Sequence, residues 1–266
     1  MVNRWIKRIY SFFIYLFLYA PIIILIIFSF NDSRYRGSWN GFTLRWYREL
    51  FTDQQIMKAL YYTLIVAALS SLIATVIGTA GAIGIHNMKK FKKTLAMNLT
   101  YLPVVNPDIV TGLSLMILFI FTRFPLGFVS LLLAHITFNI PYVVLSVLPK
   151  LKQLDKHLYE AALDLGATPF YAFQKVILPE IMPGIITGLL LAFTLSLDDF
   201  VISFFTTGSG VSTLSITVYS MARRGINPKI NALSTLLFLT VLILLVTVNK
   251  RMSKNVEDKS EETAIS

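Results

Sequence analysis

The sequence predicts an all-α polytopic membrane protein with six transmembrane helices and both termini in the cytoplasm. Hydrophobic residues make up 55% of the 266 residues and charged residues only 14%, far from the charge content of a soluble domain. Six windows are apolar and long enough for a helix to cross a hydrocarbon core about 30 Å thick, which takes roughly 20 residues. Clusters of Lys and Arg lie at alternate ends of successive windows, which places them in one compartment.

We expect one membrane domain over residues 1–266, with spans at approximately 9–30, 56–85, 95–121, 128–148, 181–205 and 230–249. The first span follows the basic stretch MVNRWIKRIY, but its apolar run is too long for a signal-peptide core and no small-residue cleavage site ends it. The second span carries small residues four apart, a spacing that lets helix backbones approach closely in lipid: Ser70, Ala74 and Gly78, then Ala80 and Gly84. LPVVNPDIV interrupts the third span, and the fourth contains Pro141.

The net charge of +10 comes from basic clusters beside the spans, which does not favour a nucleic-acid-binding surface. The clusters are Arg4, Lys7 and Arg8; Lys89, Lys90, Lys92 and Lys93; Lys150, Lys152 and Lys156; and Lys250, Arg251 and Lys254. An excess of Lys and Arg marks the cytoplasmic loops of membrane proteins, so this side is predicted to be cytoplasmic.

Two segments are expected on the outer side. The loop from Asp32 to about Gln55 contains FTLRWYREL, which is typical of an amphipathic interfacial helix. Residues 200–222 are uncharged and could form a seventh crossing, but TTGSGVST is polar and helix-breaking, and a seventh crossing would place KRMSK outside. We therefore expect a re-entrant or surface segment there, and a disordered polar tail over 251–266.

One long water-facing segment, predicted to be a cytoplasmic loop over 150–180, reads LDKHLYEAALDLGATPFYAFQKVILPEIMP from residue 154. Asp155 can cap a first helix, and Gly166 can end that helix in a left-handed conformation. Thr168 then caps a second helix with Pro169 at its first position, where the missing N–H costs nothing. We expect this second helix to end near residue 178, because Pro179 disfavours helix before it.

The same segment resembles the EAA…G…I-LP loop of ABC importer permeases. The matching residues are Glu160, Ala161, Ala162, Gly166, Leu178 and Pro179, with Val176 where isoleucine is more common. In that family the loop is a coupling helix that lies in a cleft of the ATP-hydrolysing subunit. The resemblance implies a type I ABC importer fold, in which Glu160 anchors the contact and the two alanines permit close approach. An ordinary solvated connector between spans is the alternative interpretation.

Further stretches extend the resemblance over nearly the whole chain: YAPIIILIIFSFN, PDIVTGLSL, HITFNIPYVV and LAFTLSLDDFVISFFTTG. They are similar to the C-type permease of spermidine/putrescine importers. That family implies four kinds of partner: a second homologous permease, an ATP-binding subunit dimer, an extracytoplasmic solute-binding protein and the bilayer of the bacterial inner membrane. It also implies that ATP is bound by the partner, so that this chain needs no cofactor.

Carboxylates inside the membrane are costly and therefore candidates for function. At 1.5 Å per residue, Asp108 lies ~20 Å along its span from Leu95, and Asp198 ~22 Å along its span from Pro183. Both fall in the outer half, which favours one acidic constriction for a polycationic substrate. Adjacent residues of a helix point about 100° apart, so we expect Asp198 rather than Asp199 to face the pathway, with Ser196 as an additional oxygen. As alternatives, Asp108 could merely cap a broken helix and Asp198 could mark a helix end.

Two aromatic residues complete the predicted pathway. Trp46 could contact a substrate ammonium group through its ring or anchor the chain at the interface. Tyr219 follows the glycine-rich turn and could form an outer gate. Metal binding is not expected, because the chain has no cysteine and His86, His135 and His157 lack ligand spacing.

The predicted function is that of a non-catalytic permease subunit in an ATP-driven polyamine importer. The chain has no G-x-x-x-x-G-K-[ST] phosphate loop, so ATP hydrolysis is assigned to a partner. An ABC permease for another solute, such as a different cation or an amino acid, is the alternative, and an ion-driven secondary carrier is a second one. An intramembrane enzyme is disfavoured because no nucleophile–base or metal constellation is evident.

Overall fold

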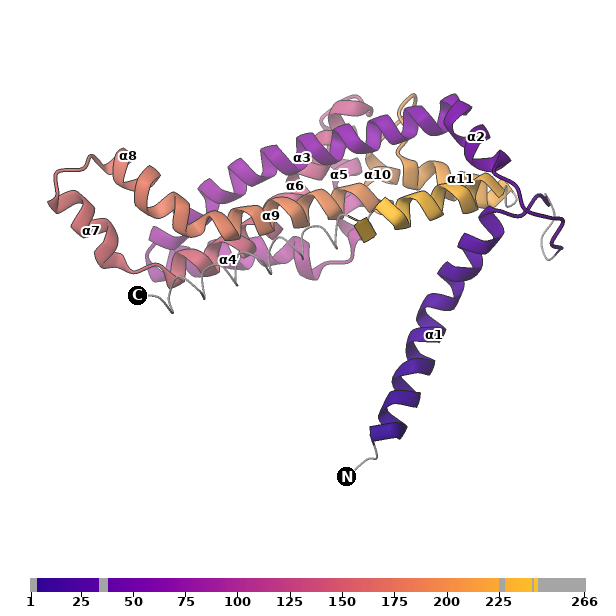
Figure 1. The fold of residues 1–266 in the computed structure, drawn as a ribbon. Helices are drawn as coiled ribbons and strands as arrows, with labels where there is room; N and C mark the ends of the chain where they lie inside the picture. Colours follow the sequence, from indigo (N-terminus) through magenta and orange to yellow (C-terminus); the bar gives the residue numbers. More distant parts are fainter. Residues whose placement is uncertain (1–3, 34–37, 225–227, 241, 244–266) are drawn as a thin grey trace. The chain divides into compact units, whose positions relative to one another are not determined.

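The computed structural model describes residues 4–33, 38–224, 228–240 and 242–243, and this part of the chain is almost entirely helical. An isolated antiparallel bridge joins Asn31 to Phe42. The chain divides into two compact units, Met1–Met57 with Val218–Ser266, and Lys58–Thr217. The two units are described separately below (Figure 1).

The second unit contains most of the long helices. Its elements are α3 (Gln54–Asn87, which begins in the first unit), α4 (Lys90–Val105), α5 (Asp108–Phe121), α6 (Phe128–Gln153), α7 (Lys156–Asp164), α8 (Pro169–Ala172), η1 (Phe173–Ile177), α9 (Leu178–Asp198) and α10 (Val201–Thr206). Helices α6 and α9 pack along one another, and α10 packs against α5 and α6. Helices α7 and α8 lie at one end of α6 and α9, and α10 lies toward the other (Figure 1).

Glycine allows the close approach of α9 to α6. A Cβ atom on Gly184 would lie 2.9 Å from the carbonyl oxygen of Ser146, and one on Gly188 would lie 3.2 Å from Cα of Val143. Around this contact a core forms from fully buried side chains that include Val147 and Ile181. The α6–α9 interface is therefore a backbone-to-backbone contact, as is common between helices in lipid.

The first set of small residues in α3 makes such a contact, as its spacing predicts. Ser70 and Ala74 are fully buried, and a Cβ on Gly78 would lie 2.7 Å from Cβ of Val143 in α6. The second set behaves differently, because Ala80 is exposed and no atom lies within 4 Å of a Cβ built on Gly84. That face of α3 is open within the described part of the chain, while Ala82 and Ile85 on another face of the same turns are buried.

The predicted break in the third span is a sharp bend. Helices α4 and α5 meet at an angle of 106°, with Asn106 and Pro107 between them in extended conformation. Proline lacks an N–H and disfavours helix in the residue before it, which explains why the chain turns here. Helix α4 packs on α6, whereas α5 packs mainly on α10.

The expectation that the helix after Thr168 ends near residue 178 is wrong. Helical structure continues from Pro169 to Asp198, a length of 30 residues, through α8, the π-helical turn η1 and α9. The N–H of Leu178 donates to the carbonyl of Phe173, five residues earlier. A proline ring in a regular α-helix clashes with the carbonyl four residues before it, here that of Lys175, and the wider π turn relieves this contact.

Four helices are long and apolar enough to cross a membrane, or up to five if the bent pair α4–α5 counts as one, by length and composition among the described residues. They are Lys7–Ser29, Gln54–Asn87, Phe128–Gln153 and Pro169–Asp198. In the region predicted as span 181–205, the helix ends at Asp198 and α10 follows as a separate short helix. Of the predicted span 230–249, residues 230–240 and 242–243 are helical, while the remainder and the tail 251–266 lie outside the described residues.

The first unit contains α1 (Arg4–Ser29), α2 (Arg45–Thr52), most of α11 (Leu214–Arg224) and a helix over residues 228–240. Helix α2 corresponds to the amphipathic segment expected in the loop after the first span. Lys229 lies 3.5 Å from Glu49 and 3.3 Å from Asp53, so an ion-pair cluster joins the helix over 228–240 to the α2–α3 turn.

The glycine-rich stretch TTGSGVST forms a loop, not a continuous helix. Gly208 and Gly210 have φ values of +65° and +94°, which residues with a side chain rarely adopt. A Cβ on Gly208 would lie 2.7 Å from the backbone oxygen of Leu126, so the loop also packs tightly there. The amide of Leu214, after the loop, donates to Oγ1 of Thr63 in α3 (2.8 Å).

Candidate functional site

Helices α7 and α8 form a hairpin (the surface hairpin, residues 155–172), and the hydrogen bonds that shape its turn join residues close in sequence. The side chain of Asp155 accepts a hydrogen bond from the amide of His157 (3.0 Å) and so caps α7. At the other end Gly166 has φ +86°, its amide donates to the carbonyl of Leu163, and the Ala167 amide donates to that of Ala162. This is a Schellman stop, and it confirms the predicted left-handed role of the glycine.

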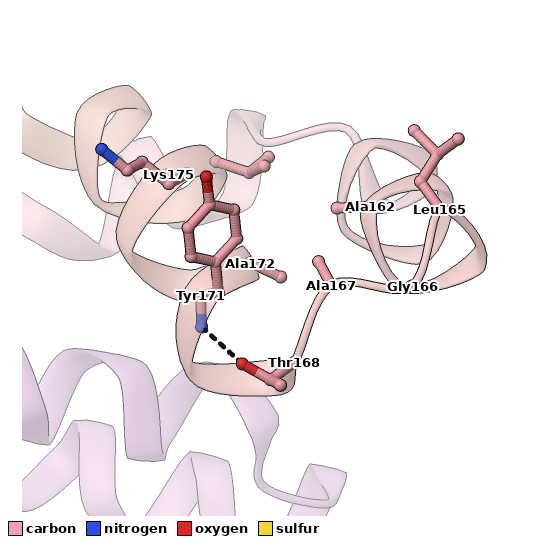
Figure 2. A pocket seen from close by; sticks show the side chains of 9 residues that line it. Ala162, Leu165, Gly166, Ala167, Thr168, Tyr171, Ala172 and Lys175 are labelled. Atoms are coloured by element: carbon pink, nitrogen blue, oxygen red, sulfur yellow. Dashed lines mark hydrogen bonds between the residues drawn. The ribbon is translucent and has the colours of Figure 1, made fainter.

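The second arm of the surface hairpin begins as predicted. Oγ1 of Thr168 accepts a hydrogen bond from the amide of Tyr171 (3.4 Å), and Pro169 occupies the first helical position (Figure 2). The chain between the Schellman stop and this cap is only a few residues long, so the two arms stay close together. The caps therefore fix a sharp turn.

A hollow of about 530 Å³ lies between the two arms. Its lining consists of Ala162, Leu165, Gly166, Ala167, Thr168, Tyr171, Ala172, Lys175 and Val176. In Figure 2 the side chains of Ala162 and Leu165 come from the α7 side, while Tyr171 and Lys175 rise from the other arm. The small side chains of alanine and glycine create the space, and one lysine supplies a positive charge at its edge.

The surface hairpin exposes apolar side chains that no other described part of the chain covers. Leu165 is 89% exposed, and Phe170 and Tyr171 are also largely exposed. Such a concentration of exposed apolar surface marks an interaction site. The sequence analysis did not single out these three residues. Apolar residues in helices too short to build a core are nevertheless a signal of an exposed contact surface.

The predicted coupling residues occupy two settings. Glu160 and Ala161 are exposed on α7, and Glu160 lies 3.6 Å from the ring of His157 in a solvent-facing pair of little energetic weight. Leu178 and Pro179 lie instead inside the continuous helix that leads from the hairpin into α9. The motif therefore covers both the exposed arm and the start of the long helix.

The end of α9 forms an acidic turn (the α9–α10 corner, residues 198–200). The Asp198 side chain is exposed, whereas that of Asp199 is only 7% exposed. The Asp199 carboxylate accepts hydrogen bonds from the amides of Ile202 (3.2 Å) and Ser203 (2.7 Å), so it caps α10. The two adjacent acids thus point in different directions, and one of them is used within the chain.

Asp108 is the first residue of α5 and is exposed, and its side chain makes no capping hydrogen bond. Because α5 packs against α10, the helix that begins at Asp108 and the α9–α10 corner are neighbours. Both exposed acids are free of the capping role that occupies Asp199.

Ser196 lies inside the helix bundle and not on an exposed surface. Its Oγ is 2.5 Å from Nδ1 of His135 and 3.0 Å from Oγ of Ser70, and the residue is only 3% exposed. In this structure its hydroxyl faces α3 and α6. His135, which the sequence offered only as an isolated histidine, is the centre of this buried arrangement.

The two aromatic residues predicted for the pathway belong to the first unit. Trp46 is buried, its Nε1–H donates to the carbonyl of Asn31 (2.7 Å), and the guanidinium of Arg45 lies 4.2 Å from its ring centre. Tyr219 is 44% exposed, and the guanidinium of Arg223 lies 5.9 Å from its ring. An arginine therefore occupies the cation-binding position near each ring in this structure.

A family model described as "binding-protein-dependent transport system inner membrane component" matches residues 74–259, which include the surface hairpin and the α9–α10 corner. The chain belongs to this family. This chain is 40% identical over 246 residues to the spermidine/putrescine transport system permease protein PotC of Escherichia coli K12, and the match covers 92% of this chain and 93% of that protein. It is 44% identical over 229 residues to the putrescine transport system permease protein PotI of the same organism, covering 83% and 81%.

Solved structures show the same fold for this inner membrane component. A bacterial ABC transporter involved in the import of the acidic polysaccharide alginate superposes with a TM-score of 0.71 at 18% identity, covering 94% of each chain. The MetNI methionine ABC transporter gives a TM-score of 0.59 at 19% identity, covering 74% of this chain and 95% of that one. The chain is thus a multi-pass helical membrane protein with the fold of ABC transporter permeases.

Proposed function

We propose that this chain is the permease subunit of an ATP-driven importer for polyamines such as spermidine and putrescine. The observation that carries the proposal is the similarity of 40% or more, over most of the chain, to proteins named as spermidine/putrescine and putrescine permeases. The exposed carboxylates of Asp108 and Asp198 support it, because a flexible polycation is bound by separated negative charges. The chain itself performs no chemistry and forms half of the translocation pathway.

The proposed assembly contains a second homologous permease, an ATP-binding subunit dimer and an extracytoplasmic solute-binding protein. The surface hairpin is the cytoplasmic contact with an ATP-binding subunit, in a bacterial inner membrane with both termini of this chain on the cytoplasmic side. Its exposed Leu165 and Phe170, and the hollow between its arms, support a docking role. Glu160, a charged and exposed residue of the same hairpin, would fix the orientation of the partner.

The continuous helix from Pro169 to Asp198 supplies the mechanical link. Its 30 residues extend over ~45 Å at 1.5 Å per residue, from the surface hairpin to the α9–α10 corner. Movement of the ATP-binding subunit at one end therefore displaces the acidic corner at the other. Closure of the ATP-binding dimer would reorient the corner, and hydrolysis would allow the polyamine to leave inward.

Uptake by the reconstituted complex tests this function. The chain is assembled with its partner permease and ATP-binding subunit in proteoliposomes, and radiolabelled spermidine and putrescine are presented with the binding protein. We expect accumulation that requires ATP on the side of the ATP-binding subunit, with labelled amino acids as the negative control. Accumulation of another solute in place of polyamines would refute the assignment, as would polyamine uptake driven by an ion gradient without the ATP-binding subunit.

Asp198→Asn is expected to raise the half-saturating polyamine concentration about ten- to a hundredfold, since one contact with a charged group is worth about 1.5–3 kcal/mol. The thermal stability of the complex should not change, because the carboxylate is exposed. Glu180→Gln is the matched control, since it removes an exposed carboxylate near the other end of the same helix. Unchanged uptake by both Asp198→Asn and Asp108→Asn would remove these acids from the pathway.

A further inference from the structure

A chain of buried polar side chains crosses the second unit beneath the α9–α10 corner (the His135 network). Its members come from α3, α6, α9, the corner and α10: Ser70, His135, Asn139, Ser196, Asp199 and Ser203. None has a side chain more than 7% exposed. Buried polar groups are costly unless they are paired. Apart from Oδ1 of Asn139, which has no hydrogen-bond partner among the described residues, the network pairs its side chains and so favours one position of the helices that contribute to it.

His135 is the residue that connects the two ends of the network. Its Nδ1 lies 2.5 Å from Oγ of Ser196, while its Nε2 lies 3.0 Å from Oγ of Ser203 and 3.5 Å from Oδ2 of Asp199. On the Ser196 side, Ser70 Oγ follows at 3.0 Å and receives a hydrogen bond from Nδ2 of Asn139 (3.3 Å). One imidazole therefore joins α6 to both α9 and α10.

The donors and acceptors of the network can be ordered in one direction. The amide of Asn139 donates to Ser70, the hydroxyl of Ser70 donates to Ser196 at 3.0 Å in preference to the more distant carbonyl of Ala67 at 3.4 Å, and the hydroxyl of Ser196 donates to Nδ1 of His135. The proton of the neutral ring then lies on Nε2, where it faces Ser203 and the Asp199 carboxylate, which only accepts when ionised. This order gives each ring nitrogen a partner without a second buried charge.

The carboxylate of Asp199 is thereby held from two sides. The amides of Ile202 and Ser203 bind it from α10, and His135 approaches it from α6. A buried carboxylate that loses a partner is strongly destabilised, so the backbone at Asp199 has little freedom while His135 is present. The preceding residue is the exposed Asp198, and its direction is set by that same backbone.

We propose that His135 is a positioning residue for the translocation of the cation. Through Asp199 and Ser203 it fixes the α9–α10 corner so that the carboxylate of Asp198 stays turned outward toward the substrate. The substrate side of this inference rests on the polyamine function proposed above. The claim that His135 fixes the α9–α10 corner does not depend on that function and is tested without any substrate.

The test uses two amide substitutions that each keep one half of the ring's contacts. The amide of His135→Gln reaches the position of Nε2, next to Ser203 and Asp199. The amide of His135→Asn reaches the position of Nδ1, next to Ser196. Because the sequence contains no cysteine, Asp198→Cys introduces the one thiol of this chain, and its labelling rate by a water-soluble maleimide, read on this chain after the subunits are separated by denaturing gel electrophoresis, reports the exposure of the corner. Each amide substitution is made in the wild-type complex for uptake and in the Asp198→Cys complex for labelling.

We expect His135→Gln to keep the labelling rate and the half-saturating polyamine concentration close to those of its parent complex. His135→Asn should change the labelling rate severalfold and raise the half-saturating concentration about tenfold, while the maximal uptake rate falls less. The reverse order, with asparagine preserved and glutamine altered, would overturn the proposal. So would parental labelling in both variants, or equal losses of labelling, uptake and thermal stability in both.

The labelling experiment separates this inference from the function proposed above. If the wild-type complex does not import polyamines, the polyamine assignment fails, and the labelling rates still decide whether His135 sets the corner. If uptake is normal in the wild type and labelling does not respond to His135→Asn, the positioning role fails alone.

Discussion

Glu160→Arg is expected to abolish stable association of the permease with its ATP-binding subunit and to reduce ATP-driven uptake to background. The side chain is 69% exposed on α7, the arm of the hairpin that ends at the exposed Leu165, so its replacement does not disturb the fold of this chain. Reversal of a charge at a docking surface replaces an attraction by a repulsion, and like-charge contacts at interfaces cost several kcal/mol. Co-purification of the ATP-binding subunit on a tagged permease measures the effect.

Glu180→Arg is the control for this reversal, since it introduces the same charge change at an exposed position of α9, beyond the hairpin. The control complex should keep its ATP-binding subunit in stoichiometric amount. If Glu160→Arg retains the ATP-binding subunit as well as Glu180→Arg does, the surface hairpin is a solvated connector and the coupling role is lost.

Gly184→Leu is expected to weaken the packing of the second unit strongly. A Cβ at this position already lies 2.9 Å from the carbonyl oxygen of Ser146 and 3.2 Å from Cα of Val147, and neither backbone atom can move alone. Overpacking by a few methylene groups costs about 1–3 kcal/mol, occasionally more, and leucine must also separate α6 from α9. Size-exclusion chromatography of the detergent-solubilised protein after a heating series should show loss of the folded peak at a much lower temperature.

Gly84→Leu carries the same substitution at a helical glycine with no atom within 4 Å of a built Cβ. Its melting profile should stay close to that of the wild type. Equal behaviour of the two variants would mean that α6 and α9 are not in backbone contact.

The parts of the site that depend on local chemistry were predictable. The caps at Asp155 and Thr168 and the left-handed Gly166 involve residues at most five apart, so the sequence contains all the interacting groups. The sharp break beside Pro107 was predictable for the same reason. Helical geometry also indicated that Asp198 and Asp199 point apart. In the structure the side chain of Asp198 is exposed and that of Asp199 is buried.

The parts that depend on helix rotation and long-range packing were not predictable. Ser196 carries the same hydroxyl whether it faces a pathway or the bundle interior, and only the position of His135, 61 residues earlier, decides between these. Continuation of the helix through Pro179 depends on the π turn before it, which no local propensity signals. Exposure of Ala80 and Gly84 likewise depends on which face of α3 meets α6, because Ala82 and Ile85 of the same turns are buried against α6.

The π turn at Phe173–Ile177 has a consequence for the direction in which the surface hairpin faces. A π turn is equivalent to one extra residue accommodated within an α-helix, and each residue advances a regular helix by about 100°. Because the turn absorbs that residue, the helical segments on its two sides keep the angular phase of a regular helix. Loss of one residue here would restore a regular α-turn and leave the direction of the hairpin unchanged, whereas a further inserted residue that the turn did not absorb would rotate the hairpin by about 100° around the helix axis.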